Sequence, residues 1–157
     1  MNNEEFYIDF DGVIVDSQKK VDYYFSLFGG EVSTPKWNRF LEEMDWVKLL
    51  KESNEIDNSF DVLKELYKLK KEVYILSRVF SNNEAKAKIE YLRDNGIQQD
   101  FITCPGRIKK SRVVIPNENR LLVDDSLGNI EDWQKNGGKT ILIPSEEQNI
   151  KCLLKRL

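Results

Sequence analysis

Two aspartates near the N-terminus, Asp9 and Asp11, have the residue type and the spacing that could support chemistry. They close a run, residues 6–10, that is typical of a buried strand, and Gly12 follows them. Alternate side chains of a strand point to the same side, so both carboxylates are predicted to face one site. Two carboxylates roughly 6 Å apart repel each other by about 3 kcal/mol at an effective dielectric constant near 20. Such a cost is expected where the carboxylates hold a cation or take part in a reaction.

A second acidic pair, Asp124 and Asp125, directly follows a short apolar run at residues 121–123. Ligands of open α/β sheets bind at the carboxyl ends of the strands, so four carboxylates are predicted to meet at one sheet edge. A small set of hard oxygen ligands favours Mg²⁺, which keeps several waters and accepts phosphate oxygens. The chain has no histidine and two distant cysteines, Cys104 and Cys152, which argues against a zinc site.

Length and composition predict one cytoplasmic domain with a small insertion. The chain has 157 residues and a formal net charge of −3, without a basic cluster that would indicate a nucleic-acid polymer as partner. The polar and acidic start, MNNEEF, does not resemble a signal peptide. No apolar run approaches the length that crosses a bilayer, so no membrane partner is expected.

Strands alternate with helices along the chain, which predicts an α/β fold, with a Rossmann-like parallel sheet and helices on both faces. The expected strands are residues 6–10, 73–76, 101–103, 121–123 and 140–143. The expected helices are residues 18–27, 36–50, 60–70, 83–95, 129–135 and 148–157, with Ser59 as the N-cap of the third. The long connection after the first strand is predicted to be a small helical cap, residues 17–59, over a core formed by residues 1–16 and 60–157.

The order of the polar residues along the chain resembles the haloacid dehalogenase-like (HAD) hydrolase superfamily, and the resemblance covers nearly the whole chain. The matching residues are Asp9 and Asp11 in DFDGV, Ser77 in YILSR, Lys109 or Lys110 in GRIKKS, and Asp124 with Asp125 in LVDDS. Each motif alone is a weak signal, and the agreement of all four in order and strand context carries the resemblance.

The resemblance implies a role for each acidic residue. Asp9 would be the nucleophile that forms an aspartyl-phosphate, and Asp11 would be the general acid that later activates water. Mg²⁺ would be held by Asp9, the main-chain carbonyl of Asp11, and the pair Asp124 and Asp125. Asp11 at this spacing resembles the phosphatase branch of the superfamily.

The resemblance also implies a phosphate-binding role for several other residues. Ser77 would donate a hydrogen bond to a phosphoryl oxygen, although a serine in such a loop is commonly a turn residue or a cap. One lysine would neutralise Asp9 and the phosphate, and Lys110 fits the family pattern better than Lys109, which would then be a surface charge. Arg78 is a further candidate near the phosphate, with an exposed loop arginine as the alternative.

The predicted reaction is therefore Mg²⁺-dependent hydrolysis of a small phosphorylated metabolite. The strings IDFDGV and LVDDS, together with the small size, resemble the 5′(3′)-deoxyribonucleotidase branch, so a nucleoside monophosphate is one candidate substrate and a sugar phosphate is the alternative. Aromatic side chains of the inserted segment would stack on a base or form the core of the cap. They are Tyr23, Tyr24, Phe25, Phe28, Trp37, Phe40 and Trp46.

Two non-catalytic readings stay open at this point. Phosphorelay receiver domains also place acids, a hydroxyl residue and a lysine around Mg²⁺, but they usually have two adjacent acids after the first strand. The aspartates here alternate with Phe10, and no aspartate directly follows residues 73–76. The other reading is a hydrolase-like fold that binds Mg²⁺ and phosphate without turnover.

Overall fold

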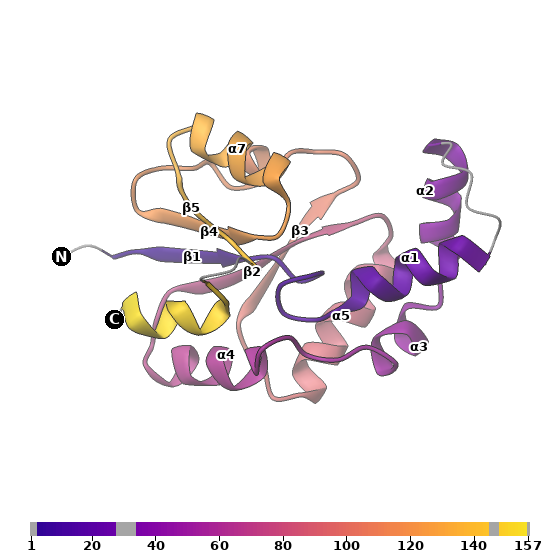
Figure 1. Ribbon diagram of the computed structural model, residues 1–157, viewed down its shortest axis with the longest axis horizontal. Coiled ribbons are helices and arrows are strands. Elements are labelled where there is room, and N and C mark those ends of the chain that lie inside the picture. The colour runs from indigo at the N-terminus through magenta and orange to yellow at the C-terminus, as the bar shows by residue number, and fades with distance from the viewer. Residues whose placement is uncertain (1–2, 28–33, 145–147, 157) are drawn as a thin grey trace.

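The computed structural model describes residues 3–27, 34–144 and 148–156, and its centre is a parallel sheet (Figure 1). Within these residues the sheet has five strands: β1 (Glu5–Ile8), β2 (Val73–Val79), β3 (Asp100–Pro105), β4 (Arg120–Asp124) and β5 (Lys139–Leu142). Their order is β3-β2-β1-β4-β5, and every neighbouring pair is parallel. The predicted α/β fold with a parallel sheet is confirmed.

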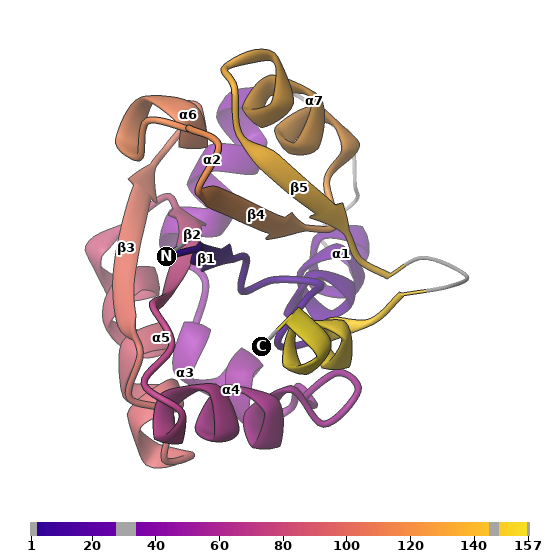
Figure 2. The ribbon, with the colours of Figure 1, turned by 90° about the vertical axis from the view of Figure 1, so that its left-hand side faces the viewer.

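Helices cover both faces of the sheet (Figures 1 and 2). One layer contains α4 (Ser59–Lys68), α5 (Asn82–Asp94) and the 3-10 helix η1 (Ile150–Arg156), and the other contains α6 (Lys110–Val113) and α7 (Leu127–Lys135). Phe6 and Ile8 of β1 pack in the cluster that includes residues of α4, α5 and η1. Tyr7 between them packs in a second cluster with Trp133 of α7. Successive side chains of β1 thus anchor the strand to both layers, which fixes the position of its carboxyl end.

The described residues between β1 and α4 form three helices, as expected for an insertion after the first strand. They are α1 (Ser17–Leu27), α2 (Thr34–Glu43) and α3 (Trp46–Lys51), and they lie beyond the carboxyl end of β1 (Figure 1). Helix α3 packs against α5, and its residues Trp46, Leu49 and Leu50 belong to the same buried cluster as Phe6 and Ile8. The inserted helices therefore share the hydrophobic core of the sheet layer, and the division into a core and a cap at residues 17–59 stays a prediction.

The predicted helix over residues 36–50 is wrong as one element. Helix α2 ends at Glu43, and α3 begins at Trp46 because the Asp45 side chain accepts a hydrogen bond from the Lys48 backbone N–H (3.1 Å). A side-chain cap of this kind satisfies a backbone N–H of the first helical turn, which otherwise has no partner within the helix. Helix α3 can therefore begin separately from α2, and the chain changes direction there.

Other predicted elements also differ in their ends or type. Ser59 is not the N-cap of α4, because Asn58 occupies that position and the Ser59 hydroxyl donates to the Ile14 carbonyl instead (2.6 Å). The C-terminal helix is a 3-10 helix. Strand β2 continues to Val79, so Ser77 and Arg78 lie within the strand and not in a loop after it. None of the helices formed by the described residues combines the length and the apolar character that crossing a bilayer requires.

Candidate active site

The carboxyl ends of β1 and β4 lie side by side at the centre of the sheet. Ile8 pairs in register with Val123, and the backbone N–H of Asp9 donates to the Val123 carbonyl (2.9 Å). The chain runs from β1 outward to β2 and β3 and then returns to β4 on the other side of β1, so the strand order reverses here. Open α/β sheets bind ligands at such a point. The register thus brings Asp9 and Asp124 together, as the sequence predicted.

Three of the four predicted acids form one group at this edge. Asp9, Asp124 and Asp125 each contribute a carboxylate oxygen, and these atoms lie within 4.8 Å of one another. Asp9 and Asp124 are buried, and Asp125 is exposed. Burial raises the pKa of Asp9 well above its usual value, and the charges of Asp124 and Asp11 add to this rise while Lys110 opposes it.

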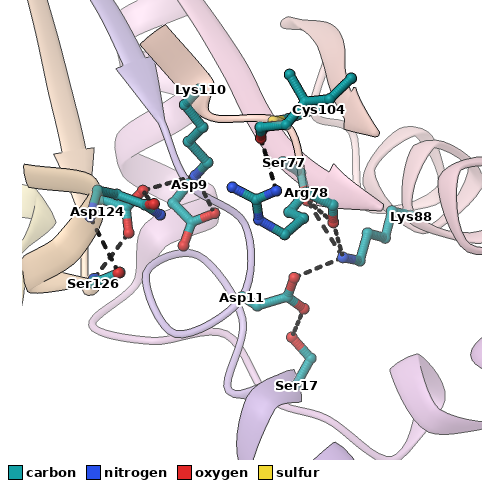
Figure 3. A network of polar contacts seen from close by, with 12 residues as sticks. Asp9, Asp11, Ser17, Ser77, Arg78, Lys88, Cys104, Lys110, Asp124 and Ser126 are labelled. Carbon is teal, nitrogen blue, oxygen red and sulfur yellow. Dashed lines mark hydrogen bonds and ion pairs between the residues drawn. The ribbon is translucent and has the colours of Figure 1, made fainter. Parts of the chain in front are cut away.

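Lys110 lies between two of these carboxylates. Its buried Nζ donates to Oδ1 of Asp9 (2.8 Å) and to Oδ2 of Asp124 (2.7 Å) (Figure 3). Burial acts to lower the pKa of Lys110, but the two carboxylates outweigh it and raise that pKa, so the ammonium stays charged. Lys109 points elsewhere, with an exposed side chain whose Nζ lies 3.5 Å from Asp132. Of the two lysines considered, Lys110 reaches the site.

The loops that carry the acids are fixed by close contacts. The Ser126 backbone N–H donates to Oδ1 of Asp124 (2.9 Å), and Nδ2 of Asn129 donates to Oδ2 (3.1 Å). Gly12 lies against Asp125, and a Cβ at Gly12 would be 2.1 Å from Oδ2 of Asp125. Gly12 also has φ +82°, a conformation that favours glycine. The glycine of DFDGV therefore allows the two acidic loops to approach.

Asp11 lies next to this group with both carboxylate oxygens engaged. Oδ1 accepts a hydrogen bond from Ser17 Oγ (2.6 Å), and Oδ2 pairs with Lys88 Nζ (2.6 Å) (Figure 3). Strand β1 ends at Ile8, so Asp9 and Asp11 both lie in the loop beyond it and the alternation of a strand does not orient them. The Asp11 side chain is outside the three-acid group, which leaves the predicted metal contact to its main-chain carbonyl.

Ser77 and Arg78 occupy the carboxyl half of β2. Ser77 is buried, and its hydroxyl accepts a hydrogen bond from Lys88 Nζ (3.3 Å). The Arg78 guanidinium donates to the carbonyl oxygens of Gly106 and Ile108 (2.8 Å for Ile108). Arg78 is thus not an exposed loop arginine, since it ties the loop between β3 and α6 to the sheet.

Lys88 and Glu84 also lie in this region, although their sequence context did not predict it. Lys88 Nζ pairs with Asp11 and with Oε2 of Glu84 (2.6 Å), and both Lys88 and Glu84 are buried. Glutamate and lysine four residues apart on a helix are typical of an exposed surface pair. The sequence has one indication that Lys88 is buried. Lys88 is adjacent to Ala87 and four residues before Leu92, which places it on the apolar face of α5.

The charges of the site fit a divalent cation bound by oxygen. The group has the three carboxylates of Asp9, Asp124 and Asp125 and one ammonium, that of Lys110, which pairs with the first two, so two negative charges remain if all three acids are ionised. Hard carboxylate oxygens in small number are ligands that Mg²⁺ accepts. We conclude that these residues could hold such an ion.

The aromatic side chains of the insertion pack on one another. The Phe25 ring lies edge to face with those of Trp37 (centroids 4.6 Å apart) and Phe40 (5.1 Å). Phe25, Phe40 and Tyr24 also line a hollow of about 470 Å³ that is formed by α1, α2, α3 and the turn between the last two. Phe28 lies outside the described residues. This packing is what the core of a helical insertion requires.

Neither a known protein family nor a curated protein matches this sequence. Solved structures do match its fold. A hydrolase from Pseudomonas syringae has a TM-score of 0.62 at 11% identity, over 88% of this chain and 83% of that chain. A phosphonoacetaldehyde hydrolase-like protein from Oleispira antarctica has a TM-score of 0.59 at 14% identity, over 91% and 73%. A HAD-superfamily hydrolase from Ehrlichia chaffeensis has a TM-score of 0.59 at 12% identity, over 99% and 97%.

At such low identities the likeness shows the fold alone, and this fold is shared with the HAD-superfamily hydrolase. The strand order also argues against the receiver-like alternative. Receiver domains of the flavodoxin-like type have the order 2-1-3-4-5, whereas the order here is β3-β2-β1-β4-β5. The acids and the lysine therefore resemble a receiver site only in their chemistry.

Proposed function

We propose that the protein is a Mg²⁺-dependent phosphatase that hydrolyses a small phosphomonoester through an aspartyl-phosphate on Asp9. The observation that carries the proposal is the convergence of Asp9, Asp124 and Asp125 on one point, with Lys110 bonded to the first two. The fold likeness supports a hydrolase, since its structural neighbours include a D,D-heptose 1,7-bisphosphate phosphatase from Burkholderia thailandensis.

Asp9, Asp11 and Lys110 each have a role in this reaction. An Asp9 oxygen attacks phosphorus, the bond from phosphorus to the leaving oxygen breaks, and Asp11 gives that oxygen a proton. Water then attacks phosphorus, Asp11 takes a proton from it, and the bond to Asp9 breaks. Lys110 offsets the charge that builds up around Asp9. Mg²⁺ bound by Asp9, Asp124, Asp125 and the Asp11 carbonyl would supply further positive charge against the phosphate.

Ser77 is the candidate donor to a phosphoryl oxygen, because it lies in the carboxyl half of β2, the strand next to β1, and its buried hydroxyl contacts the Lys88 ammonium. The contacts of Arg78 with Gly106 and Ile108 favour a supporting role over phosphate binding. Lys109 has no part in the proposal, because its side chain is exposed and lies beside Asp132.

Two substrate classes are candidates for this site. A nucleoside monophosphate and a sugar phosphate are both small phosphomonoesters, and the first would need an aromatic surface for its base. A panel of nucleoside monophosphates and sugar phosphates tests this directly. Turnover of a nucleotide above every sugar phosphate supports a nucleotidase, and turnover of sugar phosphates alone excludes it.

Release of phosphate from 4-nitrophenyl phosphate, with and without Mg²⁺, tests the proposed reaction. The wild type should be active only with Mg²⁺, and Asp9→Asn should lose at least ~1,000-fold in kcat because it removes the nucleophile. Asp94→Asn, an exposed aspartate at the end of α5, is the matched control and should keep full activity. An unchanged rate in Asp9→Asn would refute the nucleophile, and a folded but inactive wild type would favour a module that only binds.

A further inference from the structure

Helix α5 carries two ion pairs of the same spacing but of opposite environment. Lys86 and Glu90 form an exposed pair 3.9 Å apart, and the Lys86 side chain is 75% exposed. Glu84 and Lys88 form a pair 2.6 Å apart, and the Lys88 side chain is 0% exposed. Burying a lysine is costly unless its partners are well placed, so the second pair needs a reason that the first does not.

The Lys88 ammonium contacts two parts of the site as well as its own helix. Nζ pairs with Oδ2 of Asp11 (2.6 Å) and lies 3.3 Å from the Ser77 hydroxyl and 3.4 Å from the Arg78 carbonyl (Figure 3). The other Asp11 oxygen is taken by Ser17 (2.6 Å). The Asp11 carboxylate is therefore held from two sides, by the first residue of α1 and by the middle of α5.

Lys88 is itself held in place. Oε2 of Glu84 pairs with Nζ, and Oε1 of Glu84 accepts a hydrogen bond from the Phe80 backbone N–H (2.9 Å). The ammonium also lies over the rings of Phe10 (5.2 Å to the centroid) and Trp46 (5.3 Å), at the distance of a cation–π contact. The lysine thus joins the loop after β1, helix α5 and helix α3 of the insertion.

We propose that Lys88 is a positioning residue that holds the Asp11 carboxylate where it can serve the leaving-group oxygen. This inference rests on the proposed phosphatase function. A general acid contributes only when it lies within hydrogen-bond reach of the atom that receives its proton, so a carboxylate left free to rotate loses much of its effect. Glu84 would act one step further away, by fixing Lys88.

Two aryl phosphates of similar size separate positioning from a general structural effect. The 4-nitrophenolate ion leaves without a proton, whereas the more basic phenolate ion of phenyl phosphate depends on the acid. Because kcat/KM reports the steps up to the departure of the leaving group, Lys88→Met should lower it by about tenfold or more for phenyl phosphate. The value for 4-nitrophenyl phosphate should change by less than about threefold.

Lys86→Met is the matched control, because it breaks the exposed pair of the same helix and should change neither value. Equal losses with both substrates in Lys88→Met would overturn the positioning role, as would unchanged values with both. Should Lys88→Met not fold by circular dichroism, Glu84→Gln takes its place and should show a smaller loss confined to phenyl phosphate, and equal losses there would again overturn the role. A wild type inactive on both substrates would instead refute the proposed function.

Discussion

Lys109 and Lys110 are adjacent in the chain but have opposite environments. Lys110 is buried between Asp9 and Asp124, and Lys109 extends into solvent beside Asp132. An ammonium among buried carboxylates interacts far more strongly than one that water screens. Substituting each of these two lysines in turn therefore tests which one belongs to the site.

Lys110→Met should lower kcat/KM for 4-nitrophenyl phosphate by about 100-fold or more, since removing a preorganised charge at the reacting group costs about that much. Lys109→Met should stay within about twofold and should leave the free energy of unfolding within ~0.5 kcal/mol of the wild type. Steady-state kinetics and urea denaturation measure both quantities. Similar losses in the two variants would contradict the assignment of Lys110.

The positions of Asp9 and Asp124 could be predicted from sequence because each follows a buried apolar run, and parallel strands end at the same edge. Lys88 was harder to predict, because Glu84 and Lys88 have the same four-residue spacing as the exposed pair of Lys86 and Glu90, and only its neighbours on the apolar face of α5 set it apart. Only the packing of α3 and the loop after β1 onto α5 buries one pair and leaves the other in water.

Helices and strands were predicted best where the local sequence has a clear strand or turn signal. They were predicted worst where a contact with a residue far along the chain sets the boundary. The five strands lie within a few residues of their predicted positions. The helix over residues 36–50 breaks at a capping aspartate, and Ser59 is diverted from capping by the Ile14 carbonyl, 45 residues away. Strand β2 runs past its predicted end to Val79 because Ser77, Arg78 and the residue after them pair with β3.

The approach of the loop after β1 to the loop after β4 depends on Gly12. Gly12→Ala should displace Asp125 and should weaken Mg²⁺ binding and Mg²⁺-dependent turnover by about tenfold or more, because its Cβ overlaps a predicted metal ligand. Gly137→Ala is the control, since Gly137 also has a positive φ (+93°) but has no neighbour within 4 Å of a Cβ. Titration calorimetry gives the Kd of each variant, and equal effects of the two would show that backbone strain alone is responsible.

At the scale of the whole molecule, the fold holds three carboxylates together against their repulsion, so a bound cation should stabilise it. Mg²⁺ at about 100 times its Kd should raise the free energy of unfolding by about 2.7 kcal/mol. Asp124→Asn should lose most of this gain, and NaCl at equal ionic strength should not reproduce it. The metal site would be refuted if Mg²⁺ raised the free energy of unfolding of Asp124→Asn as much as that of the wild type. It would also be refuted if NaCl stabilised the wild type as much as Mg²⁺ does.

The proposed reaction depends on a covalent bond between Asp9 and phosphorus. Asp11→Asn should slow the attack of water, so the aspartyl-phosphate should accumulate when this variant is mixed with Mg²⁺ and 4-nitrophenyl phosphate. Borohydride reduces an acyl phosphate to the alcohol, and peptide mass spectrometry then identifies the residue that carried it. We expect conversion of Asp9 to homoserine that depends on substrate and Mg²⁺. Release of 4-nitrophenolate without any modification of Asp9, or with modification of another residue, would contradict it.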